Sequence, residues 1–218
     1  MNKNLYLALS LTLISLYSCS NPTEQPVSLQ PIEQLQAYVK NNTGYSFSIV
    51  DSLEYMEAKV YRAKMISGQW MAEEQTTPSE WWHWVDIAIP NVIDTDKALL
   101  FIGGGSTADE VWQLDTLNVE KAISTRAVIA HVSNIPFQPV HFGSSDTIDR
   151  YEDDLIAYGW KQFLTRGATD DQAEWLARFP MTRAVSRAMD VVQEVTSKGS
   201  LPVQEFFISG ASKRGWTT

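Results

Sequence analysis

Residues 98–105 read Ala-Leu-Leu-Phe-Ile-Gly-Gly-Gly, and this stretch decides the fold class. Its first five residues are apolar at every position, which is typical of a strand buried on both faces of a parallel sheet. The three glycines end the strand, because a residue without Cβ permits a sharp turn and a close approach by another group. The stretch therefore predicts a buried parallel strand that runs into a glycine loop.

Two similar apolar segments follow, and helical patterns separate them. Residues 127–132 predict a second buried strand. Before it, Thr107 and Glu110 have the spacing of a capping box, which predicts a helix extending to Ser124. Strand, helix and strand then form one βαβ unit. Residues 203–208 predict a third strand, which leads into Gly-Ala-Ser-Lys-Arg-Gly.

Helical periodicity fills the segment between the second and third strands. The predicted helices are one over residues 149–164, a short one over 174–178 behind a capping box of Thr169 and Gln172, and a long one that Pro180 opens and Gly199 ends. Strands that alternate with helices, with glycine turns at the strand ends, are typical of an open doubly wound α/β sheet.

The N-terminal part of the same domain has a different pattern. Residues 45–50 and 58–65 carry β-branched and aromatic residues in partial alternation, and residues 84–89 form a third such segment that Pro90 closes. Partial alternation is typical of antiparallel strands. We therefore expect the α/β sheet to be antiparallel at its N-terminal edge.

The composition excludes several classes of protein. A chain of 218 residues with 44% apolar and 11% aromatic residues can bury a substantial core, which excludes wholesale disorder. The net charge of −9 repels a phosphate backbone and argues against nucleic-acid binding. The single cysteine excludes an internal disulfide and a Cys-rich zinc or redox site. We expect no cofactor and no metal.

Residues 1–19 have the layout of a bacterial lipoprotein signal peptide. Lys3 is the only early charge, an apolar run covers residues 5–16, and Leu-Tyr-Ser-Cys ends the segment like a lipobox. We expect Cys19 to be lipidated and to anchor the protein to a membrane. A soluble secretory signal with an incidental cysteine, or an apolar strand of the domain, are the alternatives.

The residues after Cys19 refine the expected location. Ser20 favours the outer membrane of a Gram-negative cell, where the protein would face the periplasm or the surface. Residues 20–31 contain three prolines and predict a tether, and residues 32–218 form one domain without repeats. The expected location is therefore the cell envelope.

Ser212 lies between small residues where a strand ends, which is the sequence context of a nucleophile elbow. Gly210 stands two residues before it, as expected, but Arg214 stands two residues after it and the glycine comes at Gly215. This Gly-x-Ser-x-x-Gly spacing departs from the usual Gly-x-Ser-x-Gly. The alternative is a glycine turn with a helix-capping serine.

The glycine loop at residues 103–105 predicts a second part of the same site. Hydrolases with a nucleophile elbow place an oxyanion donor in a loop after an earlier buried strand. Two loops at matching strand ends would converge there. A tight strand-to-helix turn or a phosphate-binding turn are the alternatives, and the spacing of a dinucleotide fingerprint is absent.

The other chemically interesting side chains fit structural roles. All three histidines precede Ser212, whereas the histidine follows the nucleophile in this type of hydrolase. We expect His131 to lie in the core. The aromatic segment 80–84 contains His83 between tryptophans that either stack on sugar rings or fill the core. Charged residues at 150–153 suit an ion-pair network that fixes a helix start, rather than a metal site.

Several sequence blocks together resemble the PhoPQ-activated pathogenicity-related protein family. They are residues 80–84, 99–105, 135–139, 150–153 with 157–160, 179–182 with 188–190, and 210–218. The last block is the most specific, because the family has the same Lys-Arg insertion before the elbow glycine. Residues 134–138 differ from the Pro-Asn-Gln-Pro usual in the family.

The resemblance implies a fold and a site. The family is similar to α/β-hydrolases, so the sheet is expected to be an incomplete doubly wound α/β-hydrolase-like sheet. Ser212 would be the nucleophile, the amide of Lys213 one oxyanion donor, and Gly104 or Gly105 the region of the other. Members are exported or envelope-associated and are linked with bacterial virulence. They continue well beyond the elbow, where they supply the acid and the histidine.

We therefore expect the N-terminal part of an envelope-anchored serine hydrolase, close to inactive and poorly stable as the 218-residue chain because a triad member is lacking. Its substrate would be an unknown small-molecule, glycan or peptide ester or amide. A non-catalytic envelope lipoprotein that binds glycan or protein through a Trp-rich surface is the second hypothesis, and a gene fragment without function is the third. Lys213 and Arg214 would either select an acidic substrate or pair with acids from the later part of the family sequence.

Overall fold

A computed structural model describes residues 31–41 and 44–218 of the chain. The predicted signal peptide, Cys19 and residues 20–30 of the tether lie outside the described residues. Within the described ranges, no helix combines the length and apolar character needed to cross a membrane.

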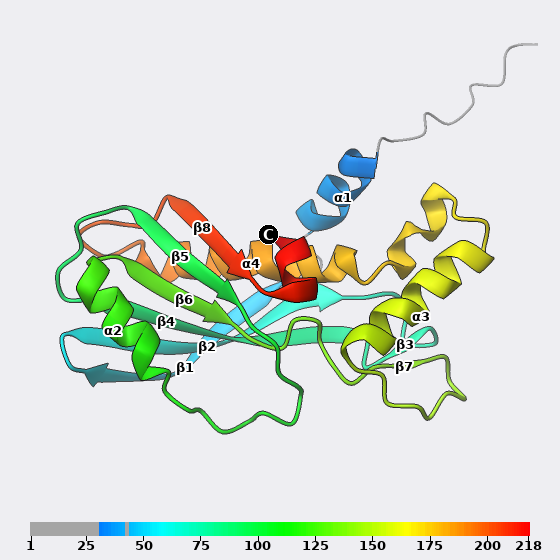
Figure 1. Cartoon of the computed structure of the whole chain (residues 1–218), viewed down its shortest axis with the longest axis horizontal. Coiled ribbons are helices and arrows are strands. Elements are labelled where there is room, and N and C mark those ends of the chain that lie inside the picture. Colours follow the sequence, from blue (N-terminus) through cyan, green and yellow to red (C-terminus); the bar gives the residue numbers. More distant parts are fainter. Residues whose placement is uncertain (1–30, 42–43) are drawn as a thin grey trace, which may run out of the picture.

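One mixed sheet of six strands forms the centre of the molecule (Figure 1), and its order is β1-β2-β4-β6-β5-β8. Its strands are β1 (Ser46–Tyr55), β2 (Ala58–Gln69), β4 (Glu80–Pro90), β5 (Lys97–Ile102), β6 (Val128–Val132) and β8 (Glu205–Gly210). The pairs along β1, β2, β4 and β6 are antiparallel, whereas β5 is parallel to both of its neighbours. This confirms the α/β sheet with an antiparallel N-terminal edge.

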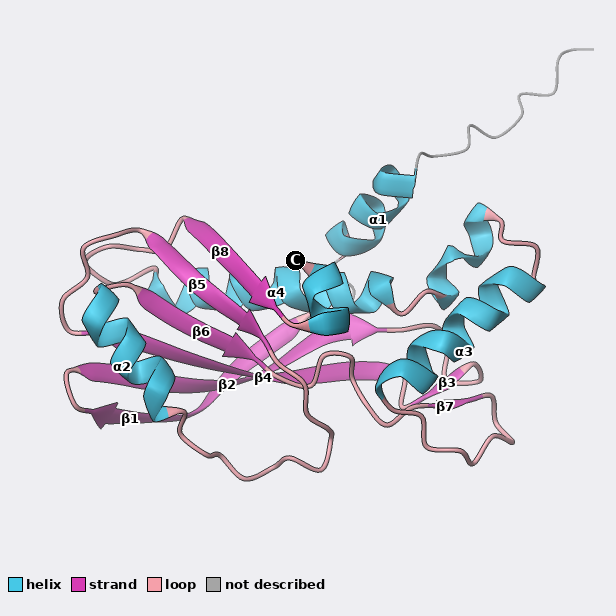
Figure 2. Cartoon of the chain, viewed as in Figure 1, coloured by secondary structure: helices cyan, strands magenta, loops and turns pink. Residues whose placement is uncertain are grey.

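Helices cover both faces of this sheet (Figure 2). On one face, α2 (Thr116–Thr125) packs Val119 and Ala122 against β2, β4 and β6. On the other face lies α4 (Arg178–Thr196), the long buried helix, with α1 (Pro31–Lys40) packed against it. The remaining elements are β3 (Thr76–Thr77), β7 (His141–Phe142), α3 (Glu152–Thr165), and the 3₁₀ helices η1 (Asp170–Trp175) and η2 (Ser212–Thr217).

The apolar run at residues 98–102 packs on both sides, as predicted. Ala98, Leu100 and Ile102 are buried in the core below α4, and Leu99 and Phe101 contact the smaller cluster below α2. From β5 the chain crosses through α2 to β6 on one side and later returns through α4 to β8 on the other. Ligand crevices in doubly wound sheets form outside the carboxyl ends of strands at such a switch point.

Two of the predicted helix starts are wrong. Residues 103–114 form a loop, and α2 begins at Thr116 with Asp115 as its N-cap, because the Asp115 Oδ1 accepts from the Asn118 amide at 3.2 Å. The loop is held instead by Asp109, whose carboxylate accepts from the Ser106 amide at 2.7 Å. This local turn competes with helix formation.

The second capping box also fails. Thr169 makes no side-chain cap, and the segment behind it is the 3₁₀ helix η1. The long helix does contain Pro180 in its first turn, but it ends at Thr196, before Gly199. The first two strands extend beyond their predicted ends, to Tyr55 and Gln69.

Candidate active site

Ser212 and the glycine loop leave the sheet at the same edge. β5 and β8 are parallel neighbours, and Ile102 at the end of β5 is paired with Gly210 at the end of β8. Ser212 is exposed, and its φ of +55° is a left-handed conformation that is uncommon outside glycine. Such strained residues cluster at functional sites, and a nucleophile elbow has this sharp strand-to-helix turn.

The two elbow glycines explain the irregular spacing around Ser212. A Cβ on Gly210 would lie 2.7 Å from the carbonyl carbon and oxygen of Arg214, and a Cβ on Gly215 would lie 2.9 Å from the carbonyl oxygen of Gly210. The turn of η2 therefore brings residue 215 against residue 210. The extra residue in Gly-x-Ser-x-x-Gly is compatible with a tight elbow.

The glycine loop is anchored through its carbonyl groups. The Asn134 amide donates to the Gly104 carbonyl at 2.7 Å, and the Ile135 amide donates to the Gly103 carbonyl at 3.1 Å. The amides of Gly104 and Gly105 donate no hydrogen bond within the described part of the chain. A Cβ on Gly104 would collide with the Arg214 guanidinium, so this loop touches the elbow.

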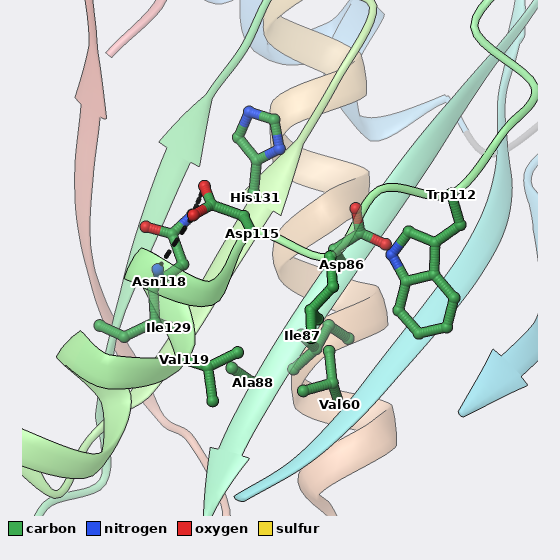
Figure 3. A pocket seen from close by; sticks show the side chains of 11 residues that line it. Val60, Asp86, Ile87, Ala88, Trp112, Asp115, Asn118, Val119, Ile129 and His131 are labelled. Carbon is green, nitrogen blue, oxygen red and sulfur yellow. Dashed lines mark hydrogen bonds between the residues drawn. The ribbon is translucent and has the colours of Figure 1, made fainter. Parts of the chain in front are cut away.

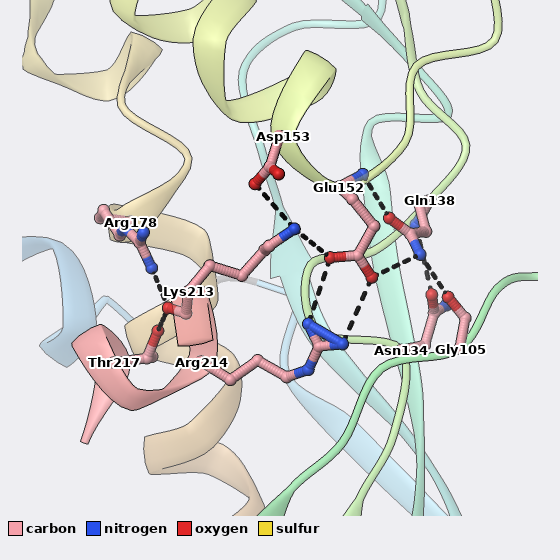
Figure 4. Close-up of polar contacts among 9 residues, drawn as sticks. All are labelled: Gly105, Asn134, Gln138, Glu152, Asp153, Arg178, Lys213, Arg214 and Thr217. Carbon is pink, nitrogen blue, oxygen red and sulfur yellow. Dashed lines mark hydrogen bonds and ion pairs between the residues drawn. The ribbon is translucent and has the colours of Figure 1, made fainter. Parts of the chain in front are cut away.

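The basic pair after the serine is bound by acids at the start of α3 (Figure 4). Lys213 Nζ lies 2.7 Å from both the Glu152 and the Asp153 carboxylates, and Arg214 forms a two-pronged contact with Glu152 at 3.1 and 3.3 Å. Burial lowers the pKa of Lys213, but the carboxylates of Asp153 and Glu152 outweigh burial and leave this pKa raised. Among the described residues, the partners of these bases are thus Glu152 and Asp153, which precede the elbow.

Comparison with known proteins gives the family. The model of the PhoPQ-activated pathogenicity-related protein family matches residues 35–218. The chain belongs to this family. It is 38% identical over 179 residues to autocrine proliferation repressor protein A of Dictyostelium discoideum, a match that covers 80% of the chain and 35% of the relative. The chain thus spans about a third of the length of this curated relative.

Some solved structures also have a similar fold. A glucuronoyl esterase from Solibacter usitatus is 12% identical, with a TM-score of 0.48, and the match covers 85% of the chain and 52% of the esterase. Acetyl xylan esterase 1 from Thermoanaerobacterium sp. is 12% identical, with a TM-score of 0.47 and coverage of 85% and 51%.

Within the described residues, no histidine forms a hydrogen bond with Ser212. His83 is fully buried, its Nε2 lies 3.0 Å from the Ser67 hydroxyl, and burial lowers its pKa to about 4. His141 contacts Asp149 at 2.5 Å near the small sheet. Among the described residues, no side chain is hydrogen-bonded to Ser212.

His131 was predicted to lie in the core, but it is only partly buried. It is half-buried on β6 and lines a small pocket beneath α2 together with Asp86, Asp115 and Asn118 (Figure 3). Burial lowers the pKa of His131 and raises that of Asp86 to about 6. An adjoining hollow of about 380 Å³ extends from His131 to Gly210. The described ranges contain no group of three or more His, Cys, Asp or Glu residues suited to hold a metal ion.

The tryptophan-rich strand is mainly structural. Trp81 is fully buried and stacks on Phe137 with ring centroids 5.7 Å apart, so of the two alternatives for the tryptophans, Trp81 fills the core. Trp82 and Trp84 are half-buried, and Lys64 and Arg62 lie over their rings.

Sequence reasoning placed Ser212 and the glycine loop at neighbouring strand ends but missed the side chains that connect them. Glu152 was expected to join Arg150 in a network local to its helix. Arg150 does bind Asp146 and Asp154 locally, at 3.0 and 3.1 Å, whereas Glu152 reaches the elbow. The missed member is Gln138, whose only signal in the sequence is its place in a block shared with the family.

Proposed function

We propose that Ser212 is the nucleophile of a serine hydrolase that transfers an acyl group from an ester or amide to water. The observation that carries this proposal is the exposed Ser212 in a left-handed conformation at the end of β8, directly beside the glycine loop. An unstrained capping serine would need neither the positive φ nor the close packing of Gly210 on Gly215.

The proposed reaction follows from this geometry. The Ser212 oxygen attacks the carbonyl carbon, and the carbonyl electron pair moves to the oxygen. The amide of Lys213 and an amide of Gly104 or Gly105 donate to this oxyanion. When the carbonyl re-forms, the alcohol or amine leaves, and water then releases the acid from the serine. A histidine held by a carboxylate, which we place in the part of the protein beyond the elbow, takes the Ser212 proton and gives it to the leaving alcohol or amine. It then takes a proton from the attacking water and returns it to the Ser212 oxygen as the acid is released.

The role of Lys213 in this proposal lies in its backbone amide. Its side-chain charge and that of Arg214 face the carboxylates of Glu152 and Asp153. Neutralised cations provide little attraction for an acidic substrate. The proposed substrate is therefore a small molecule, glycan or peptide whose ester or amide group, rather than its charge, is recognised here.

We further propose an envelope location with a lipid anchor on Cys19, facing the periplasm or the cell surface, and a link to virulence through the family. A clickable palmitate analogue fed to cells tests the anchor. The proposal predicts labelling that Cys19→Ala abolishes, whereas labelling of the Cys19→Ala protein contradicts it.

The nucleophile is tested by fluorophosphonate labelling of the protein produced from its complete reading frame. Ser212→Ala should abolish labelling, and Ser209→Ala should leave it unchanged, because Ser209 is also exposed but lies in extended β8. Labelling that survives Ser212→Ala would rule out this nucleophile.

A further inference from the structure

Glu152 joins separate segments of the chain beside the candidate active site (Figure 4). Its Oε2 lies 2.7 Å from Lys213 Nζ and 3.1 Å from Arg214 Nη1. Its Oε1 lies 3.3 Å from both Arg214 Nη2 and Gln138 Nε2. Oε2 thus binds the elbow alone, whereas Oε1 is shared between the elbow and the loop that follows β6.

Gln138 continues this connection to the glycine loop. Its buried side-chain amide donates to the Gly105 carbonyl at 2.6 Å, and its Oε1 accepts from the backbone amide of Glu152 at 2.8 Å. The backbone amide of Thr107 also donates to the Gln138 carbonyl, at 2.9 Å. Any displacement of Glu152 is therefore transmitted to Gly105 through one buried side chain.

Arg214 closes the arrangement from the other side. Its guanidinium lies against Gly104, where no Cβ would fit, while its two terminal nitrogens bind Glu152. A two-pronged contact between a guanidinium and a carboxylate fixes orientation as well as distance. The Glu152 carboxylate therefore links the elbow, which it binds directly, to the glycine loop, which it reaches through Gln138.

The backbone conformation of Glu152 and the charges around it are consistent with a fixed position of its carboxylate. Its φ is +48°, an uncommon value for a residue with a side chain, and such values persist where surrounding contacts determine them. The side chains of Lys213 and Arg214 are only 14% and 19% exposed, so their charges need the neighbouring carboxylates. Asp153 is 88% exposed and binds Lys213 alone.

We propose that Glu152 is a positioning residue that sets the separation of the two oxyanion-donor loops. The proposal rests on the proposed hydrolase function. Glu152 does not touch the substrate; it keeps the amide of Lys213 and the amides of the glycine loop directed at one point. Loss of one oxyanion donor typically lowers kcat by about 10²- to 10³-fold, which sets the scale of the expected effect.

The test measures kcat and KM for a p-nitrophenyl ester with the protein from its complete reading frame, after fluorophosphonate titration has counted the active sites. Glu152→Ala should lower kcat per titrated site by about 10²-fold or more, the scale of a lost oxyanion donor, and change KM much less. Glu152→Gln keeps one acceptor oxygen and should lose less. The matched control, Asp153→Ala, removes the other carboxylate on Lys213 and should leave kcat nearly unchanged.

A double-mutant cycle separates positioning from folding. If Glu152 acts through Gln138, the Glu152→Ala/Gln138→Ala double variant should be no slower than the slower single variant. Fewer titrated sites with an unchanged kcat per site, in Glu152→Ala or in the milder Glu152→Gln, would overturn the positioning role and leave the hydrolase proposal intact. Absence of Ser212-dependent titration in the unchanged protein would overturn the hydrolase function, and the positioning role with it.

Discussion

The aromatic core on the α4 side of β4 and the polar corner at the ends of β5 and β8 are held together in different ways. In the core, Trp81 packs between Trp70 and Phe137, with ring centroids 5.3 and 5.7 Å away, and the neighbouring histidine is kept neutral by burial. In the corner, two residues with side chains have positive φ and four charges lie in contact. The core provides stability, whereas the corner concentrates backbone strain and charge, which is typical of functional sites.

The largest expected effect on stability comes from the core. Trp81→Ala removes a fully buried ring and should lower the free energy of unfolding by about 3–5 kcal/mol. The rate of fluorophosphonate labelling per folded molecule should stay the same, because the ring does not contact the corner. Denaturant titration measures the free energy of unfolding. Trp216→Ala is the control, since Trp216 is 80% exposed. An equal loss in both variants would contradict the distinction between core and surface.

The next effect concerns two titrating groups on β4 that face opposite sides of the sheet. Burial lowers the pKa of His83 to about 4, so its contribution to stability is present above its unfolded pKa and is lost as the pH falls from about 6.5 to 4. Burial raises the pKa of Asp86 to about 6, so its contribution has the opposite sign and is lost as the pH rises from about 4 to 6. Over its pH range, each group changes the free energy of unfolding by about 3 kcal/mol. The two changes have opposite signs and largely cancel.

Replacing one of the two groups should reveal the pH dependence that the other group causes. With Asp86→Asn, the free energy of unfolding should rise between pH 4 and 6.5, and with His83→Gln it should fall between pH 4 and 6. Urea titrations over this range measure both. If the two variants had parallel profiles, the assignment of opposite signs would be wrong.

A smaller effect on stability, but a larger one on labelling, is expected in the corner. Gly210→Ala places a Cβ 2.7 Å from the Arg214 backbone, which cannot move without opening the elbow. Overpacking of this kind costs about 1–3 kcal/mol. Labelling of Ser212 should slow more than in Trp81→Ala, despite the smaller loss of stability. Slower labelling of Trp81→Ala than of Gly210→Ala would contradict the functional distinction between core and corner.

The smallest expected effect concerns the cap of α2. Asp115→Ala removes the acceptor for the Asn118 amide and should cost about 1 kcal/mol. Asp115→Asn retains a side-chain acceptor and should recover most of this loss. Thermal melting measures the difference, and an unchanged Asp115→Ala protein would show that the cap does not stabilise α2.

Features formed by residues that are neighbours in the chain could be predicted from the sequence, whereas contacts between distant segments could not. The strands were predictable because apolar runs such as residues 98–102 report burial directly, and the elbow was predictable because Gly210 and Ser212 are neighbours in the chain. The partners of Lys213 were not, because Glu152 lies some 60 residues away and the sequence gives no signal for a contact made through folding. The helix expected from Thr107 failed because Asp109 forms a competing local turn.

The most direct test of the central claim is a crystal structure of the fluorophosphonate adduct of the protein from its complete reading frame. The phosphorus should be bonded to the Ser212 oxygen. Its phosphoryl oxygen should lie about 2.7–3.1 Å from the amide of Lys213 and from an amide of Gly104 or Gly105. A phosphoryl oxygen directed into solvent, away from both loops, would contradict the shared site at the ends of β5 and β8.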